Sequence, residues 1–151
     1  MRRLLDRRTF VSMVVLGGGG LLAARGIYRP RASASATGGV PAWLVALASR
    51  AAALNGVPHP THAEAVFTTR QRAIDAQSAG RVDSDQPAYL VVLQGDFVDT
   101  HARTPNGQTI YGTVMTLVVD PVTRGTLDFG LGYHLPDMSQ LGPVTDFSDQ
   151  L

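Results

Sequence analysis

The chain has 151 residues and a formal net charge of +1, and it contains neither cysteine nor lysine. A chain of this length suits one domain with appendages. The lack of cysteine excludes disulfides, thiolate catalysis and cysteine-based zinc or iron–sulfur sites.

The charge divides the chain into two segments. Residues 1–36 carry seven arginines and one acidic residue, whereas residues 37–151 carry six arginines and eleven acidic residues. The second segment therefore has a net charge of −5, six minus eleven. This charge argues against binding to nucleic acid or to an anionic membrane, because both need a basic surface. We expect only the second segment to fold as a domain.

Residues 1–36 have the order of an export signal. Arginines come first, the stretch Thr9–Ala24 is uncharged, and small residues follow. The A-x-A pattern places the predicted cleavage region at Ala34 and Ala36.

The run Asp6–Val11, with the sequence DRRTFV, resembles the twin-arginine translocation motif through Arg7, Arg8 and Phe10. This resemblance implies export of a folded protein across a bacterial cytoplasmic membrane, to the cell surface or beyond. An ordinary secretory signal is the alternative, as is a retained anchor.

Residues 37–40 are predicted as a linker, and a helix is expected over Pro41–Asn55, ending before Gly56. Its apolar residues recur at helical spacing and should face the sheet. These residues are Trp43, Leu44, Leu47, Ala51 and Leu54. We interpret the single tryptophan as a core anchor rather than a ring that stacks on a ligand.

A short strand is predicted over Ala63–Thr68, followed by a second helix over Arg70–Ser78 with Thr69 as its N-cap. Gly80 should end this helix, and a polar loop follows over Arg81–Gln86.

Three consecutive strands are then expected, over Tyr89–Val98, Thr109–Asp120 and Thr126–Tyr133. The first is apolar on both faces and should be covered on both. The third alternates between a buried face and an open, glycine-lined face. The buried face would hold Leu127, Phe129, Leu131 and Tyr133, and the open face Asp128, Gly130 and Gly132.

This open face and the long loop Asp99–Gln108 are where we expect function. Residues 136–151 lack periodicity and are predicted as an irregular arm, with Leu141 and Val144 against the domain. The predicted domain, residues 41–135, is α+β: one or two helices packed on a three- to four-stranded, mainly antiparallel sheet.

The hairpin Leu117–Asp120 and Thr123–Leu127 is similar to the valine–aspartate and threonine–glycine hairpin of PepSY-type domains, although Arg124 separates the threonine from the glycine. This resemblance implies a PepSY-like or cystatin-like fold and an extracytoplasmic interaction or peptidase-modulating module. It transfers no catalytic residue. A wider set of segments resembles small exported actinobacterial proteins of unassigned function: Tyr89–Phe97, Gly112–Asp120, Leu127–Gly130 and Leu141–Val144.

Two groups of polar residues are candidates for chemistry. His59 and His62 form an H-x-x-H pair that would need His101, His134 or a carboxylate to bind a metal. We favour solvated loop histidines and predict no metal site and no cofactor.

The second group contains Asp96, Asp99 and His101, with Thr100 or Thr104 as a conceivable nucleophile. Roles in a turn explain these residue types equally well, so we predict no catalytic residue. Asp120 and Asp128 flank the last hairpin and are interpreted as caps.

Four aromatic residues can share one sheet face, as core if the helices cover it and as a ligand groove if they do not. They are Tyr89, Tyr111, Phe129 and Tyr133, and we expect core.

The predicted function is that of an exported, non-enzymatic module that binds an unidentified protein or peptide, through main-chain pairing at an exposed sheet edge. One alternative is a small exported enzyme that binds a metal or cofactor through His59 and His62 with His101 or His134. Another is a ligand-carrying cup with a deep aromatic pocket.

Overall fold

The computed structural model describes residues 39–100, 104 and 106–151. The export signal predicted for residues 1–36, with Arg7, Arg8, Phe10 and the cleavage region, lies outside these residues. Among the described residues, none of the helices is both long enough and apolar enough to cross a membrane.

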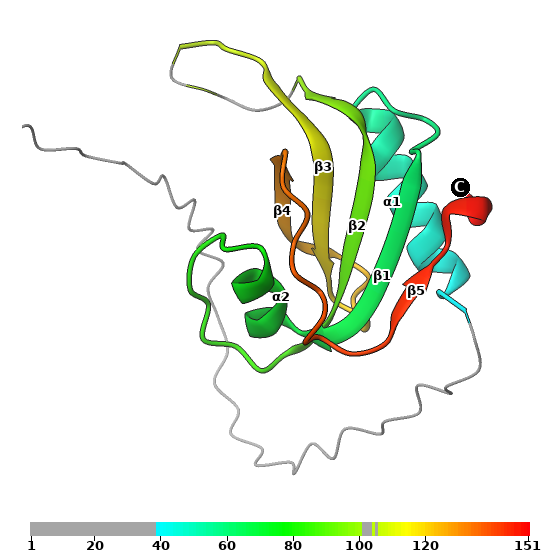
Figure 1. Cartoon of the computed structure of the whole chain (residues 1–151), viewed down its shortest axis with the longest axis vertical. Helices are drawn as coiled ribbons and strands as arrows, with labels where there is room; N and C mark the ends of the chain where they lie inside the picture. Colours follow the sequence, from blue (N-terminus) through cyan, green and yellow to red (C-terminus); the bar gives the residue numbers. More distant parts are fainter. Residues whose placement is uncertain (1–38, 101–103, 105) are drawn as a thin grey trace, which may run out of the picture. The chain divides into compact units, whose positions relative to one another are not determined.

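The described chain has α+β architecture, as predicted (Figure 1). Its elements, in order, are α1 (Ala42–Leu54), β1 (His62–Thr69), α2 (Arg70–Ala76), β2 (Pro87–Asp99), β3 (Ile110–Val119), β4 (Thr126–Gly132), β5 (Val144–Asp146) and the 3-10 turn η1 (Ser148–Gln150).

The strands form one antiparallel sheet in the order β4-β3-β2-β1-β5, so β4 and β5 are its edges within the described residues. Each of the four predicted strands is present. β2 is buried on both faces, as expected, because Leu90, Val91, Val92 and Leu93 are all fully buried.

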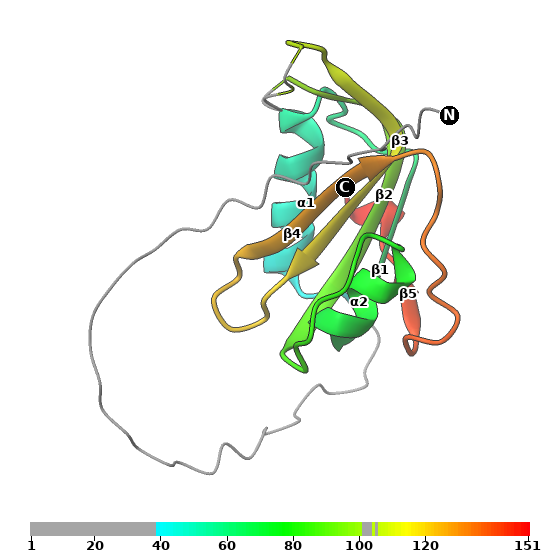
Figure 2. The same cartoon turned by 90° about the vertical axis from the view of Figure 1, so that its left-hand side faces the viewer.

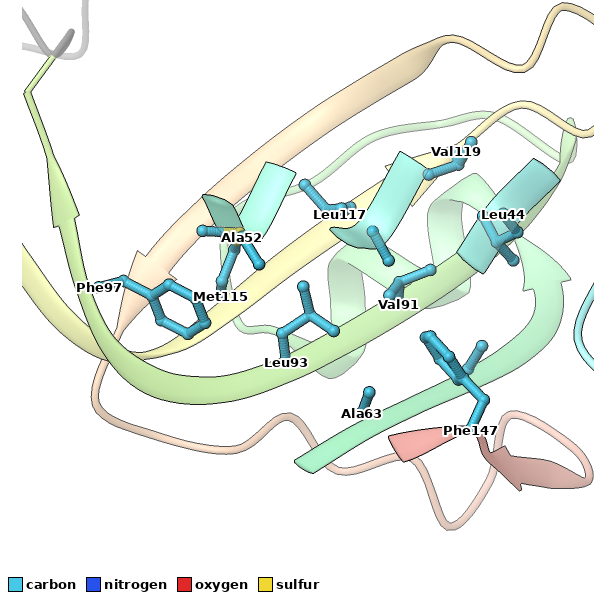
Figure 3. Packing of buried hydrophobic residues seen from close by; sticks show 12 residues of the cluster. Leu44, Ala52, Ala63, Val91, Leu93, Phe97, Met115, Leu117, Val119 and Phe147 are labelled. Atoms are coloured by element: carbon cyan, nitrogen blue, oxygen red, sulfur yellow. The ribbon is translucent and has the colours of Figure 1, made fainter. Parts of the chain in front are cut away.

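The two helices pack on opposite faces of the sheet (Figure 2). The α1 face carries the larger core, in which side chains of α1 meet Val91, Leu93, Met115 and Leu117 (Figure 3). The α2 face carries a second cluster, in which Ala73 and Ile74 meet residues of β1, β2 and β3.

The buried stripe of α1 differs from the predicted one. Leu44, Ala48 and Ala52 are fully buried, while Leu54 is 58% exposed. The buried residues are spaced by four, so they form one row, and the alanines let the helix approach the sheet closely. Leu54 lies two residues beyond Ala52 and therefore about 200° around the helix.

α2 begins where expected, because the Thr69 hydroxyl accepts a hydrogen bond from the Arg72 N–H (3.4 Å) and caps the helix. It ends at Ala76, and Ser78 then adopts a left-handed conformation with φ of 52°. This short helix covers only part of its face of the sheet.

β4 departs from simple alternation. Val118 pairs with Asp128, but Val119 pairs with Thr126, so Leu127 is an extra residue in β4. Leu127 consequently packs with the α2-side cluster, whereas Leu131 packs against the α1-side core. The prediction that both share one buried face was therefore wrong.

The prediction of an irregular arm over residues 136–151 was also wrong in part. β5 pairs with β1, and Phe147 is 1% exposed within the α1-side core. Leu141 is buried as expected, but Val144 is 42% exposed and is held by strand pairing instead. A strand of three residues is too short to show periodicity in the sequence.

Candidate functional site

A trough with a volume of about 430 Å³ lies on the α2 face of the sheet, over β3 and β4. Val114, Thr116, Gly130 and Gly132 belong to its floor, which corresponds to the open face predicted for β4. One wall is the end of α2, with Gln77 and Ser78, and the other is the segment 134–136. Because the floor includes the edge strand β4, the trough extends to the edge of the sheet.

The two floor glycines have different roles. A Cβ atom on Gly132 would meet nothing within 4 Å, so the missing side chain there leaves open space in the trough. A Cβ atom on Gly130 would lie 2.5 Å from Thr116 Oγ1 and 3.4 Å from Gln77 Oε1. Gly130 is therefore needed because the Thr116 and Gln77 side chains occupy the space above it.

Gln77 and Thr116 form a small polar network beside these glycines. The Thr116 hydroxyl donates to Gln77 Oε1 (2.5 Å), and Gln77 Nε2 donates to the Ala73 carbonyl (2.8 Å). This use leaves the second Nε2 hydrogen of Gln77 and the lone pairs of the Thr116 hydroxyl for a ligand. Among the described residues, the trough is lined by no carboxylate and no guanidinium, and His134 is its single ionisable side chain, so most of its polar groups suit an uncharged ligand.

The outer edge of β4 offers main-chain hydrogen-bonding groups. The Asp120 N–H donates to the Gly125 carbonyl (2.9 Å), which shows that residue 120 turns its main chain toward β4. Because strand residues point their N–H and C=O groups alternately to either side, Thr116 also turns its groups toward its partner Gly130.

The main-chain groups of the residues on either side of Gly130 in β4 therefore point in the opposite direction, away from β3. Phe129 and Leu131 direct their N–H and C=O groups away from β3, and the described chain has no strand beyond β4. Two residues with free edge groups thus flank a glycine on the floor of the trough.

A second hollow, of about 610 Å³, adjoins the trough and shares Val114 and Leu135 with it. His59 and Asp96 line this hollow, while His134 lines the trough. His59 and His134 therefore belong to neighbouring hollows.

The other two histidines, His62 and His101, are not found in these hollows among the described residues. His62 lies in β1 beside Glu64 and Asp146, each 3.6 Å away, and His101 lies outside the described residues. Across residues 39–100, 104 and 106–151, no group of three or more histidine or acidic side chains is arranged to hold a metal ion.

His62 and Ser148 form a contact that the sequence did not predict. Ser148 Oγ lies 3.2 Å from His62 Nδ1, and the same oxygen accepts from the Ala63 N–H (2.9 Å) and donates to Asp146 Oδ1 (2.7 Å). This serine, histidine and carboxylate set fastens the C-terminal arm to β1. The bonds from Ser148 also hold the pKa of Asp146 below its usual value.

The structure describes some, but not all, of the candidate catalytic residues near the loop Asp99–Gln108. Asp96 is exposed at the second hollow, and the Thr104 hydroxyl donates to the Gln108 carbonyl (2.7 Å) inside the loop. His101 lies outside the described residues, so the candidate pairing of His101 with Asp96 or Asp99 is untested, and the prediction of no catalytic residue stands as a prediction.

The two aspartates of the last hairpin have different roles. Asp120 caps the turn, because its carboxylate accepts from the N–H groups of Val122 (2.7 Å) and Thr123 (3.3 Å). Asp128 is not a cap. It forms a bidentate ion pair with Arg70, with distances of 2.8 and 2.9 Å, that joins β4 to the start of α2.

The expected aromatic core is mostly exposed. Tyr111, Phe129 and Tyr133 are 58%, 46% and 64% exposed, so these three rings do not belong to the core. Tyr89 is half-buried, and its ring meets Trp43 edge-on at 5.9 Å. Trp43 packs against the core, which confirms that it is an anchor.

Comparison of the chain with models of protein families, with curated proteins and with solved structures finds no match. The resemblance to PepSY-type domains therefore stays a prediction.

Proposed function

We propose that this protein is an exported binding module that takes up an extended peptide segment along the open edge of β4. The observation that carries this proposal is the pair of residues Phe129 and Leu131, whose main-chain groups face outward beside the trough. A peptide strand placed there would extend the sheet through main-chain hydrogen bonds, and the trough would receive one of its side chains.

The composition of β4 supports an added strand. An edge strand is commonly protected from pairing by lysine, proline or an inward-pointing charge. β4 has the sequence TLDFGLG, and its single charged residue, Asp128, is paired with Arg70 on the α2 face. The aromatic rings of Phe129 and Tyr133 are exposed at the same edge and would be covered by a partner.

The charge of the domain indicates a basic partner. Residues 37–151 carry six arginines and eleven acidic residues. Charge complementarity accelerates association and excludes acidic partners, so a peptide with basic ends is favoured.

The binding test uses a fluorescein-labelled peptide of alternating threonine and valine, with terminal arginines and a central tyrosine. Binding to the purified chain is followed by fluorescence anisotropy. Phe129→Pro removes an outward N–H, whereas Phe129→Ala removes the same ring and keeps the N–H. We expect binding to Phe129→Pro to be about five- to tenfold weaker than binding to Phe129→Ala, because one main-chain bond is lost and the proline ring obstructs the edge.

Equal binding to the two variants would contradict pairing at the β4 edge. A proline in an edge strand is tolerated when its N–H would face solvent, so both variants should stay folded. Far-ultraviolet circular dichroism checks this directly.

Export is tested separately. Replacing Arg7 and Arg8 by lysine should abolish export of the chain from a bacterial host with a twin-arginine pathway, while the same change at Arg2 and Arg3 should not. Export of both variants at the wild-type level would contradict a twin-arginine signal.

A further inference from the structure

We propose that the trough is a subsite for a tyrosine side chain of the added peptide strand. This inference rests on the proposed binding at the β4 edge and adds the chemistry of the residue that enters the trough. It is carried by the two floor glycines and by the polar pair formed by Gln77 and Thr116.

The position of the subsite follows from the hydrogen-bonding pattern of the β4 edge. Phe129 and Leu131 make the hydrogen bonds to an antiparallel added strand, so Gly130 lies between them at a non-hydrogen-bonded position. At such a position the two Cα atoms are about 4.5 Å apart and the side chains stand on the same face. The residue opposite Gly130 therefore points its side chain to the α2 face, where the trough lies.

The floor glycines favour a large, flat side chain at that position. Thr116 and Gln77 occupy the space above Gly130, whereas the space beside Gly132 is open to at least 4 Å and no side chain fills it. An aromatic ring on a neighbouring strand can cover an edge glycine and restore the missing contact. The trough, at about 430 Å³, is large enough for a ring, since ligand pockets commonly have volumes of ~300–1,000 Å³.

The polar pair favours a hydroxyl at the tip of the ring. Gln77 keeps one amide hydrogen as a donor, and the Thr116 oxygen keeps lone pairs as acceptors. A phenol can accept from the first and donate to the second. On the described lining, a basic side chain would find no carboxylate, and an acidic one would find no arginine and only the imidazole of His134.

The experiment compares host peptides that differ only at the central residue: tyrosine, phenylalanine, alanine or glutamate. We expect the tyrosine peptide to bind about tenfold more tightly than the alanine peptide, as the burial of one ring allows, and the glutamate peptide to bind no better than alanine. The phenylalanine peptide should fall between tyrosine and alanine.

Two variants locate the effect in the trough. Gly132→Val places a side chain in the open space of the trough floor, where a Cβ atom meets nothing within 4 Å, and should abolish the preference for tyrosine over alanine. Gln77→Met keeps the length of the side chain but removes one of the two partners of the phenol, so it should reduce the preference for tyrosine over phenylalanine. Thr126→Val, on the same strand but outside the trough, is the matched control and should behave as the wild type.

The outcomes distinguish failure of the tyrosine subsite from failure of peptide pairing at the β4 edge. If every host peptide binds equally and Phe129→Pro still weakens them all, the subsite is refuted and the edge proposal stands. Equal binding of tyrosine and phenylalanine to the wild type would overturn the role given to Gln77 and Thr116. If Phe129→Pro and Phe129→Ala bind alike, the edge proposal fails, and the subsite as defined here fails with it.

Discussion

Gly130 and Gly132 provide a matched pair of substitutions that tests the description of the trough. They lie two residues apart on the same strand and the same face, and each is replaced by alanine. Gly130→Ala should destabilise the fold, because the new Cβ would lie 2.5 Å from the Thr116 oxygen. Gly132→Ala should not, because its Cβ would meet nothing within 4 Å.

The loss of stability expected for Gly130→Ala depends on which side chain must move to relieve the clash. Thr116 is 7% exposed and its χ1 angle is stiff, so relief of the clash requires its hydroxyl to leave Gln77. Losing a bond of a buried hydroxyl costs about 1–3 kcal/mol. Replacing glycine by alanine lowers the conformational entropy of the unfolded chain and thereby stabilises the fold by about 0.4–1 kcal/mol. The expected net loss for Gly130→Ala is therefore about 1–2 kcal/mol, while Gly132→Ala should be neutral or stabilising by about 0.5 kcal/mol.

The assay is equilibrium urea denaturation followed by the fluorescence of Trp43, the single tryptophan. The decisive control is a double-mutant cycle with Thr116→Ala, which removes the clashing oxygen. In that background Gly130→Ala should cost nothing. An equal loss of stability from Gly130→Ala in both backgrounds, or an equal loss from Gly132→Ala, would refute a clash between residue 130 and Thr116.

Three further predictions concern the elements that hold β4 and the arm. Asp120→Asn should lose about 1–2 kcal/mol at pH 7 in urea denaturation, because the carboxylate accepts from two turn N–H groups and from Gln86 Nε2. These bonds, that of Val122 first, lower the pKa of Asp120, so its contribution is complete above the ordinary aspartate pKa. The difference between wild type and Asp120→Asn should therefore shrink as the pH falls through the lowered pKa, and a constant difference would contradict this account. A double-mutant cycle on Arg70→Gln and Asp128→Asn should give a coupling of about 1 kcal/mol that weakens at high salt, since both side chains are over a quarter exposed. Phe147→Ala should cost about 3–5 kcal/mol in thermal or urea unfolding, because the ring is fully buried, and an unchanged stability would show that the arm is dispensable.

The sequence predicted the elements that carry strong local patterns. β2 was recognised because both of its faces are apolar over Leu90–Leu93, and α2 because Thr69 supplies its cap. The glycine alternation of β4 predicted the open face that forms the floor of the trough. Each of these signals lies within one stretch of about ten residues, where periodicity and capping act.

What the sequence did not predict depends on contacts between distant residues. Ser148 and His62 meet across 86 positions, and the walls of the trough come from α2 and from the segment after β4. The placement of α1 and α2 on opposite faces likewise follows from packing. The bulge at Leu127 depends on how β4 pairs with β3, and no pattern within the sequence of β4 predicts it.

The incomplete cover of the α2 face and the open β4 edge have one physical consequence in common. α2 has seven residues, and it leaves the β3 and β4 end of its face uncovered. A larger side chain at residue 132 would fill this gap, yet glycine stands there without any steric need for it. Glycine inside a strand weakens the strand, because it has more backbone entropy to lose and no side chain to pack. Gly130 is explained by Thr116, but Gly132 is not explained by any contact in the described fold. A partner side chain that occupies the trough would account for it, and for this reason Gly132→Val separates a binding surface from a defect in packing.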